Sequence, residues 1–274
     1  SVDSCGSTSG EVSEKLNSRQ ASANDSYDWS LNKAEHQVAD FCRTNHMTYT
    51  IIRPSTIIGP MATYRAEGNE LGPFKVICDL HDARKLVNEA EQSVVVESEP
   101  GACVNVIPVD QVIYDMLYLS SINFGEQKVY HLSSTDFVVK AAMGVAMDQA
   151  GIKNIEFDKR GAGYKTSSID RMIQEHMSHY QPIFHSHKTY QRSLPEHRKL
   201  TLKDLERYFG NYICLLKKRE AQKGFENRLV ADEMPDFERP ESKQVDGFNP
   251  DRRKLSWVNT GELESIDLGE QIIA

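Results

Sequence analysis

The chain has 274 residues, of which 39% are hydrophobic and 26% charged, so it is long enough for one large domain or one and a half. Its net charge of −8 argues against nucleic acid or an anionic membrane as the main partner. No apolar run approaches the ~20 residues of a membrane-spanning helix, so we expect no transmembrane segment.

The cysteines are scattered and odd in number: Cys5, Cys42, Cys78, Cys103 and Cys214. Such a set fits the reduced thiols of a cytoplasmic protein better than a disulfide framework or a zinc site. The chain does not begin with Met, which leaves open that the numbering starts inside a longer protein.

Residues 1–16 are mostly small and polar, and we interpret them as the end of a strand that enters a loop. Residues 17–26 are also polar and are predicted to form a loop over the site.

A helix and a strand are predicted next. Ser26 can cap the helix, and apolar residues recur at helical spacing after it, namely Leu31, Ala34, Val38, Phe41 and Cys42. Residues 48–53 are rich in β-branched side chains and predict a buried strand, which Pro54 ends because it lacks a ladder donor. Such a helix, turn and strand make half of a parallel α/β repeat, whose ligands sit at the carboxyl ends of the strands.

This unit carries a spaced pattern, consisting of Tyr27, Ser30 and Glu35 on the helix and Arg53, Pro54, Ser55 and Gly59 after it. The pattern resembles Tyr-x-x-Ser-Lys-x-x-x-Glu and Arg-Pro-Ser of the extended short-chain dehydrogenase/reductase family, in its fatty acyl-CoA reductase and thioester reductase branch. The resemblance covers about residues 2–216 and only the second half of the family's domain.

The resemblance implies a nicotinamide cofactor, NADP or NAD, and an acyl-CoA or acyl-carrier substrate. It implies that Tyr27 is the catalytic acid and that the Ser4 hydroxyl hydrogen-bonds the substrate carbonyl. It also implies that Tyr27, Pro54, Ser55 and Thr56 contact the cofactor.

Leu31 stands where the family has its catalytic lysine. A free phenol has a pKa near ~10, and a lysine one turn along the helix lowers that pKa and holds the cofactor ribose. Leucine does neither, and Lys33 points away from the Tyr27 face, about 600° around the helix. Trp29 and Lys33 have the right mutual spacing, but an indole is not an acid. We interpret the pair as weakened or lost; the alternatives are an unusual mechanism, an engineered substitution, or a purely structural Tyr27.

The sequence has no glycine-rich turn of the kind that cradles a pyrophosphate. Gly161-Ala162-Gly163 lacks a third glycine and a following helix, so we interpret it as a loop. The nucleotide-binding half is therefore expected upstream, on a partner chain, or not at all.

Further elements follow in order: a loop at 54–73, a helix at 74–88 and a strand at 93–97. Residues 104–112 resemble the family's Val-Pro-Val-Asp segment, in which Pro108 turns the chain and Asp110 caps a helix. The residues that follow with helical spacing are Ile113, Met116, Leu117 and Ser120. A strand at 128–132 precedes a helix at 137–149, which Ser133, Ser134 and Thr135 are expected to cap.

Four histidines lie close together, namely His176, His179, His185 and His187. We predict no metal site, because no acidic or cysteine ligand has matching spacing. Acyl reductases carry a similar aromatic segment over the acyl chain. The resemblance therefore implies that Tyr180, Ile183 and Phe184 line a substrate tunnel, with an ordinary core as the alternative.

Residues 202–218 predict an amphipathic helix, and the polar, proline-punctuated stretch after it predicts an extended tail. The expected fold is α/β. Residues 1–150 are the second half of a Rossmann-like doubly wound parallel sheet, 151–223 a helical substrate cap and 224–274 the tail. The implied function is NAD(P)H-dependent reduction of an acyl thioester to the aldehyde or alcohol. The alternative is a catalytically silent subunit that acts as a binding or scaffolding protein.

Overall fold

The computed structural model describes residues 1–66, 72–122 and 127–233. The chain divides into two compact units, Ser1–Asn227 and Arg228–Ala274. The first unit holds all the elements discussed below except the last turns of its final helix. The tail predicted from residue 224 begins as helix, because α8 runs from Leu202 to Glu233; residues 234–274 lie outside the described residues.

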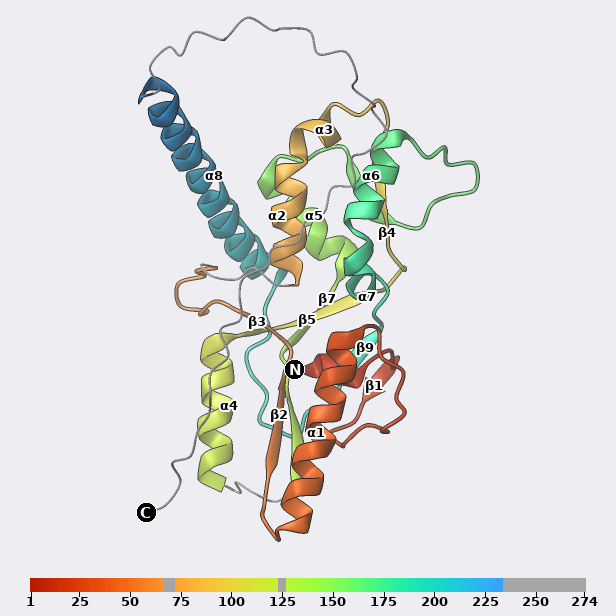
Figure 1. Cartoon of the computed structure of the whole chain (residues 1–274), viewed down its shortest axis with the longest axis vertical. Helices are drawn as coiled ribbons and strands as arrows, with labels where there is room; N and C mark the ends of the chain where they lie inside the picture. The colour runs from red at the N-terminus through yellow and green to blue at the C-terminus, as the bar shows by residue number, and fades with distance from the viewer. Residues whose placement is uncertain (67–71, 123–126, 234–274) are drawn as a thin grey trace, which may run out of the picture. The chain divides into compact units, whose positions relative to one another are not determined.

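The first unit mixes helices with short, mostly parallel strands (Figure 1). Its first elements are the 3₁₀ turn η1 (Val2–Cys5), β1 (Gly10–Val12), α1 (Ser26–Thr44), β2 (Thr50–Pro54) and β3 (Thr56–Ile58). Next come α2 (Pro73–Asp82), α3 (Arg84–Asn88), β4 (Val94–Glu97), β5 (Cys103–Pro108), α4 (Val109–Ile122), β6 (Lys128–Leu132), β7 (Thr135–Val138) and α5 (Val139–Ala150). The last are β8 (Ile155–Asp158), α6 (Ser168–His176), η2 (Ser178–Tyr180), α7 (Gln181–Phe184), β9 (Lys188–Tyr190) and α8.

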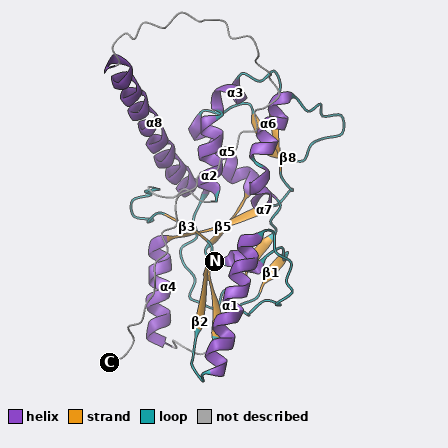
Figure 2. Ribbon diagram, viewed as in Figure 1, coloured by secondary structure: helices purple, strands orange, loops and turns teal. Residues whose placement is uncertain are grey.

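Four small sheets organise the described strands (Figure 2). The parallel pairs are β1 with β9, β2 with β6, β3 with β5 and β4 with β8. Only β7 runs antiparallel, against β5. These parallel strands and their helices confirm the predicted α/β fold class.

The β2–β6 pair carries a different layer on each face. In its register Ile52 lies opposite Tyr130 and Arg53 opposite His131, and neighbouring residues of a strand point to opposite faces. Ile52 and Tyr130 belong to an apolar cluster with Val112 of α4. On the other face Arg53 bonds to a residue of α1. Among the described residues no third strand pairs with β2.

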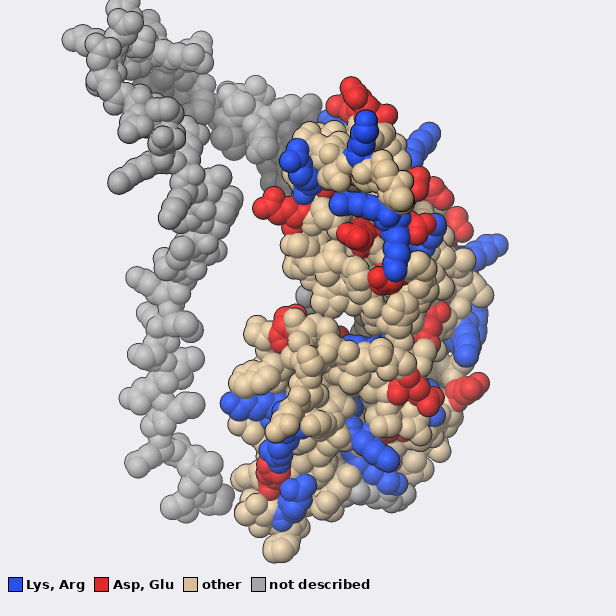
Figure 3. Space-filling view, turned by 90° about the vertical axis from the view of Figure 1, so that its right-hand side faces the viewer, with Lys and Arg blue, Asp and Glu red and all other residues tan. Residues whose placement is uncertain are grey.

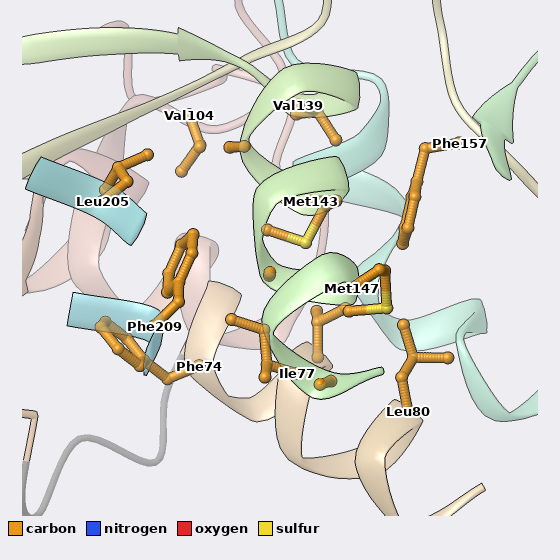
Figure 4. Close-up of a cluster of buried hydrophobic side chains, with 14 of the residues drawn as sticks. Phe74, Ile77, Leu80, Val104, Val139, Met143, Met147, Phe157, Leu205 and Phe209 are labelled. Atoms are coloured by element: carbon orange, nitrogen blue, oxygen red, sulfur yellow. The ribbon is translucent and has the colours of Figure 1, made fainter. Parts of the chain in front are cut away.

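The main core lies where α2, α5 and α8 meet (Figure 4). Phe74 of α2 packs edge-on against Phe209 and Tyr212 of α8, at centroid distances of 5.6 and 5.1 Å. Met143 and Met147 of α5 fill the space beside α2. This core fixes the region after residue 150 against the strands that carry the site.

Several boundaries differ from the prediction. Asp25, not Ser26, caps α1, because its carboxylate accepts the Asp28 backbone N–H. The helix expected at 74–88 is broken at Ala83 into α2 and α3. The expected cap Ser133-Ser134-Thr135 leads instead into β7, and Val138 occupies the N-cap of α5 without a side-chain bond.

Two further expectations were wrong. The N-terminal residues expected to end a strand form η1, and the first strand is β1. The Asp110 carboxylate accepts the Met61 backbone N–H at 3.1 Å, so it holds the loop after β3.

Basic and acidic side chains are interspersed over the face shown in Figure 3, in line with the chain's 32 basic and 40 acidic residues. None of the described helices is both long enough and apolar enough to span a bilayer.

Candidate functional site

A cavity of about 220 Å³ lies beside the start of α1. It gathers residues from elements that are far apart in the sequence. They include Tyr27 and Asp28 of α1, Thr56 of β3, Cys103 and Asn105 of β5, Ile183 of α7, and Lys188 and Tyr190 of β9. We refer to it as the Tyr27 cavity.

Capping fixes the position of Tyr27 at the cavity. The Asp25 carboxylate accepts the Asp28 N–H at 2.9 Å, so the helix begins immediately before Tyr27. The buried Asp28 carboxylate in turn accepts the Asn24 side-chain and backbone N–H groups. Burial raises the pKa of Asp28, although the bonds from Asn24 oppose this. Tyr27 itself is 57% exposed, so its phenol is accessible to a ligand.

Of the three residues predicted to approach a cofactor after β2, Thr56 lines the Tyr27 cavity. Pro54 ends β2 and is half-buried. The Ser55 backbone N–H donates to the Leu132 carbonyl at 3.0 Å, and its hydroxyl is buried with no partner among the described residues. The β2–β3 turn therefore presents one of the three side chains to the cavity.

Ser4, the other predicted catalytic residue, is only 1% exposed. Its hydroxyl has no hydrogen-bond partner among the described residues, while its carbonyl accepts from Asn17 and Asn32. Its neighbours Val2 and Asp3 line the Tyr27 cavity, but Ser4 does not. The structure thus brings Ser4 near the cavity without exposing its hydroxyl there.

The helix positions that follow Tyr27 supply no cation to the cavity. Leu31 is half-buried, and the exposed Lys33 amine lies 4.7 Å from the centre of the Trp29 ring. The expected mutual spacing of Trp29 and Lys33 is confirmed, and neither lines the cavity. Among the described lining residues the lysine is Lys188, which comes from β9.

The three residues predicted to form a substrate tunnel are separated. Ile183 lines the Tyr27 cavity, whereas Tyr180 and Phe184 lie in the main core, 7% and 0% exposed. The Tyr180 hydroxyl donates to Asp79 at 2.6 Å. Burial and then this carboxylate raise the pKa of Tyr180 well above its usual range. Tyr180 and Phe184 are therefore core residues in this structure, and the half-buried Ile183 packs against that core and also lines the cavity.

A buried ion pair holds α1 against the sheet. Arg53 is fully buried, and its Nε and Nη2 donate to the two carboxylate oxygens of Glu35 at 2.9 and 2.6 Å. Its third nitrogen lies 3.3 Å from His131 Nε2. Burial, the largest single effect, lowers the pKa of Arg53, but the bond to Glu35 and the charges of Cys5 and Glu35 together raise it above its usual value. The Glu and Arg of the sequence pattern thus position the helix that carries Tyr27.

The four histidines do not gather into one cluster. The rings of His176 and His179 are 6.3 Å apart, and no group of three potential metal ligands comes together within the described ranges. His179 instead lines the Tyr27 cavity.

The lining residues that sequence reasoning missed include Cys103, Asn105, Lys188 and Tyr190. Asn105 had a usable signal, since it is a polar residue inside an apolar strand. Its side-chain NH₂ group donates to the Asp136 carboxylate, and its side-chain oxygen accepts the Ser134 backbone N–H. Lys188 and Tyr190 had none, because β9 has three residues and pairs with β1 from the other end of the unit. Burial raises the pKa of Tyr190, which keeps its phenol protonated.

No protein-family model and no curated protein matches the sequence. Solved structures are similar at low identity. UDP-glucuronic acid 4-epimerase from Bacillus cereus, in complex with NAD, is 14% identical with a TM-score of 0.49, over 78% of this chain and 58% of that chain. dTDP-glucose 4,6-dehydratase from Bacillus anthracis, in complex with NAD, is 11% identical with a TM-score of 0.43, over 80% and 60%. RMD from Pseudomonas aeruginosa, complexed with NADPH, is 15% identical with a TM-score of 0.38, over 71% and 58%. The chain therefore spans less than two thirds of each of these proteins.

Proposed function

We propose that this chain forms the substrate side of an NAD(P)H-dependent reductase that acts on an acyl thioester, carried by CoA or by an acyl carrier. The observation that supports the proposal is the lining of the Tyr27 cavity. Tyr27, Thr56 and Ile183 were assigned the roles of acid, cofactor contact and substrate contact, and all three line this one cavity.

The residues at the cavity suit the nicotinamide end of such a cofactor. Thr56, with the backbone of Pro54 and Ser55, would hold that end, and the cofactor supplies the hydride when bound. The Tyr27 phenol would donate a hydrogen bond to the carbonyl oxygen as negative charge develops there, and a proton if the aldehyde continues to the alcohol. The Ser4 hydroxyl has no partner among the described residues, but it is buried beside the cavity, so it would act as the second donor only after a local movement that exposes it.

Lys188 is our candidate for the positive charge that Leu31 cannot supply. A cation near a phenol stabilises the phenolate and so makes the proton easier to transfer. Lys188 reaches the Tyr27 cavity from β9 rather than from the tyrosine's own helix.

Among the described strands β2 pairs with β6 alone, and this supports a place for the nucleotide-binding half beside β2. Parallel sheets are covered on both faces, as β2–β6 is by α1 and α4, and they grow by adding strands at an edge. A partner that contributes a parallel strand beside β2 would continue the three layers and bring its own phosphate-binding turn to Tyr27. That partner is an upstream segment or a second chain.

Leu31 favours a second candidate, a silent subunit that keeps the fold as a binding or scaffolding protein. Such a subunit needs the Glu35–Arg53 pair and the core, but not the phenol.

The test uses the protein from its native source, with whatever half accompanies it. NADPH oxidation is followed with a long-chain acyl-CoA, and NADPH binding by its fluorescence. A reductase loses turnover in Tyr27→Phe, loses most of it in Lys188→Met, and gains in Leu31→Lys. Absence of turnover in the native protein and in Leu31→Lys would reject the reductase and leave the silent subunit.

A further inference from the structure

A second, larger cavity of about 640 Å³ lies beside α2 and α6. Its apolar lining comes from Leu86 of α3 and from Met172 and Ile173 of α6, together with Ala83. Ile173 is buried, whereas Met172 and Leu86 are 47% and 36% exposed. Exposed apolar side chains of this size carry an unfavourable hydration free energy, which a bound apolar group would relieve. We refer to it as the α2–α6 cavity.

The two cavities meet at His179. This residue lines both the Tyr27 cavity and the α2–α6 cavity. Its ring centroid is 3.8 Å from that of Tyr180 and 6.3 Å from that of His176, another lining residue of the larger cavity. The two cavities are therefore adjacent, with the His179 side chain between them.

The two cavities differ in volume. Pockets that bury an organic ligand have volumes of roughly 300–1,000 Å³. The 220 Å³ of the Tyr27 cavity fall below that range, and the 640 Å³ of the α2–α6 cavity lie within it. A substrate whose reacting carbonyl lies at Tyr27 must extend elsewhere.

Charge decides which part of a substrate the larger cavity accepts. Asp79, Asp82 and Glu175 line it. Asp79 is 7% exposed, accepts the Tyr180 hydroxyl and pairs with Lys75. Carboxylates at the lining repel phosphate and carboxylate groups, so the anionic end of a thioester carrier is excluded. The apolar lining remains available to an uncharged chain.

We propose that the α2–α6 cavity binds the uncharged hydrocarbon tail of the substrate, with His179 at the bend between the tail and the reacting carbonyl. This inference rests on the proposed acyl thioester function and adds to it where the tail lies. In this arrangement Tyr180 does not touch the tail. Its hydroxyl holds Asp79, which lines the cavity.

The test measures binding to the full chain without cofactor. Nile red, a neutral dye that fluoresces in apolar sites, is displaced by dodecanol, dodecanoate or dodecylammonium. We expect dodecanol to compete about tenfold better than dodecanoate. Met172→Asp, at an exposed position that leaves the core intact, should weaken dodecanol binding about tenfold, because the new charge must be desolvated. Leu86→Glu should do the same.

The matched control is Leu117→Asp, which places the same charge on an exposed apolar residue of α4 and should bind like the unmodified protein. Unchanged dodecanol binding in both Met172→Asp and Leu86→Glu would overturn the proposal. Dodecylammonium binding about tenfold tighter than dodecanol would also overturn it, because the cavity would then be a cation site. Tail binding without thioester turnover would reject the reductase alone, which keeps the two failures distinct.

Discussion

The Arg53 guanidinium and the Glu35 carboxylate form a bidentate ion pair in which the arginine is fully buried. The pair joins β2 to α1, the helix that also carries Tyr27. The orientation of this candidate acid therefore depends on the buried ion pair.

Removing one member of this pair should destabilise the fold strongly. Glu35→Gln leaves the Arg53 charge buried and unpaired, and we expect a loss of about 3–5 kcal/mol in the free energy of unfolding. Urea denaturation measures it. The control is Asp40→Asn, which breaks the exposed Arg19 and Arg43 pairs and should change stability little. Equal effects of the two variants would contradict the prediction.

His131 should make the protein less stable in mild acid. Its Nδ1 lies 3.0 Å from the Gln191 carbonyl and its Nε2 faces Arg53, so the neutral ring carries its proton on Nδ1. Burial, reinforced by the charge of Arg53, lowers the pKa of His131 from its usual 6.5. The unfolded chain therefore binds the proton first, and stability falls as the pH drops below about 6.5.

The slope of that loss identifies the residue. One such histidine contributes up to about 1.4 kcal/mol per pH unit. Urea titrations between about pH 5 and 7 should give a shallower slope for His131→Gln, whereas His185→Gln, at an exposed position, should keep the original slope. An unchanged slope in His131→Gln would show that His131 does not cause the loss of stability in acid.

Asp170 should act in the opposite direction and at lower pH. Its carboxylate accepts the Ser167 N–H and hydroxyl and the Val95 N–H, and it closes a capping box at the start of α6. Burial opposes ionisation, but these bonds, together with one from the Tyr164 hydroxyl, lower the pKa of Asp170 from 3.8 to about 2. Ionised Asp170 therefore contributes about 2 kcal/mol above pH 4, which is lost as the pH falls through about 2.

Asp170→Asn should accordingly lower the free energy of unfolding by about 2 kcal/mol at neutral pH, and the deficit should shrink as the solution is acidified. Asp148→Asn, on the exposed side of α5, serves as the control. A deficit that stays constant from pH 7 to about 2 would show that ionisation is not its cause.

Cys103 should report on occupancy of the Tyr27 cavity. Burial, and then Asp136, raise the pKa of this thiol, so less thiolate is present at neutral pH. Mass spectrometry after brief alkylation should show the exposed Cys214 modified first and Cys103 later. An acyl thioester should slow Cys103 further and leave Cys214 unchanged. Modification of Cys103 at the same rate with and without ligand would place the ligand elsewhere.

The sequence carried enough signal for the elements around the site. The β-branched runs of β2 and β6 and the periodicity of α1 follow from local pattern, and their boundaries agree within a few residues. The orientation of α4 did not follow. Ile113, Met116 and Leu117 have helical spacing but are exposed, and Val112 and Leu119 face the sheet instead. Because α4 is apolar on several sides, its sequence does not show which side is buried. Packing against the β2–β6 sheet determines that side.

The site was predictable only in the part that a motif carries. Tyr27 and Thr56 came from a contiguous pattern, and Ile183 from a local resemblance. Lys188 and Tyr190 reach the cavity through β1–β9 pairing, which joins the two ends of the unit and leaves no local trace. Ser4 shows that a motif can also mislead. It matches the family's position, but that match does not determine whether its hydroxyl is exposed.

The pairing of β2 has a consequence for handling the protein. In the described part of the chain β2 pairs with a single strand, β6. A strand that pairs on one side only is a place where a further strand can add, from a peptide or from another copy of the chain. We therefore expect association of the purified chain at high concentration to start at β2, and light scattering over a range of protein concentrations checks it.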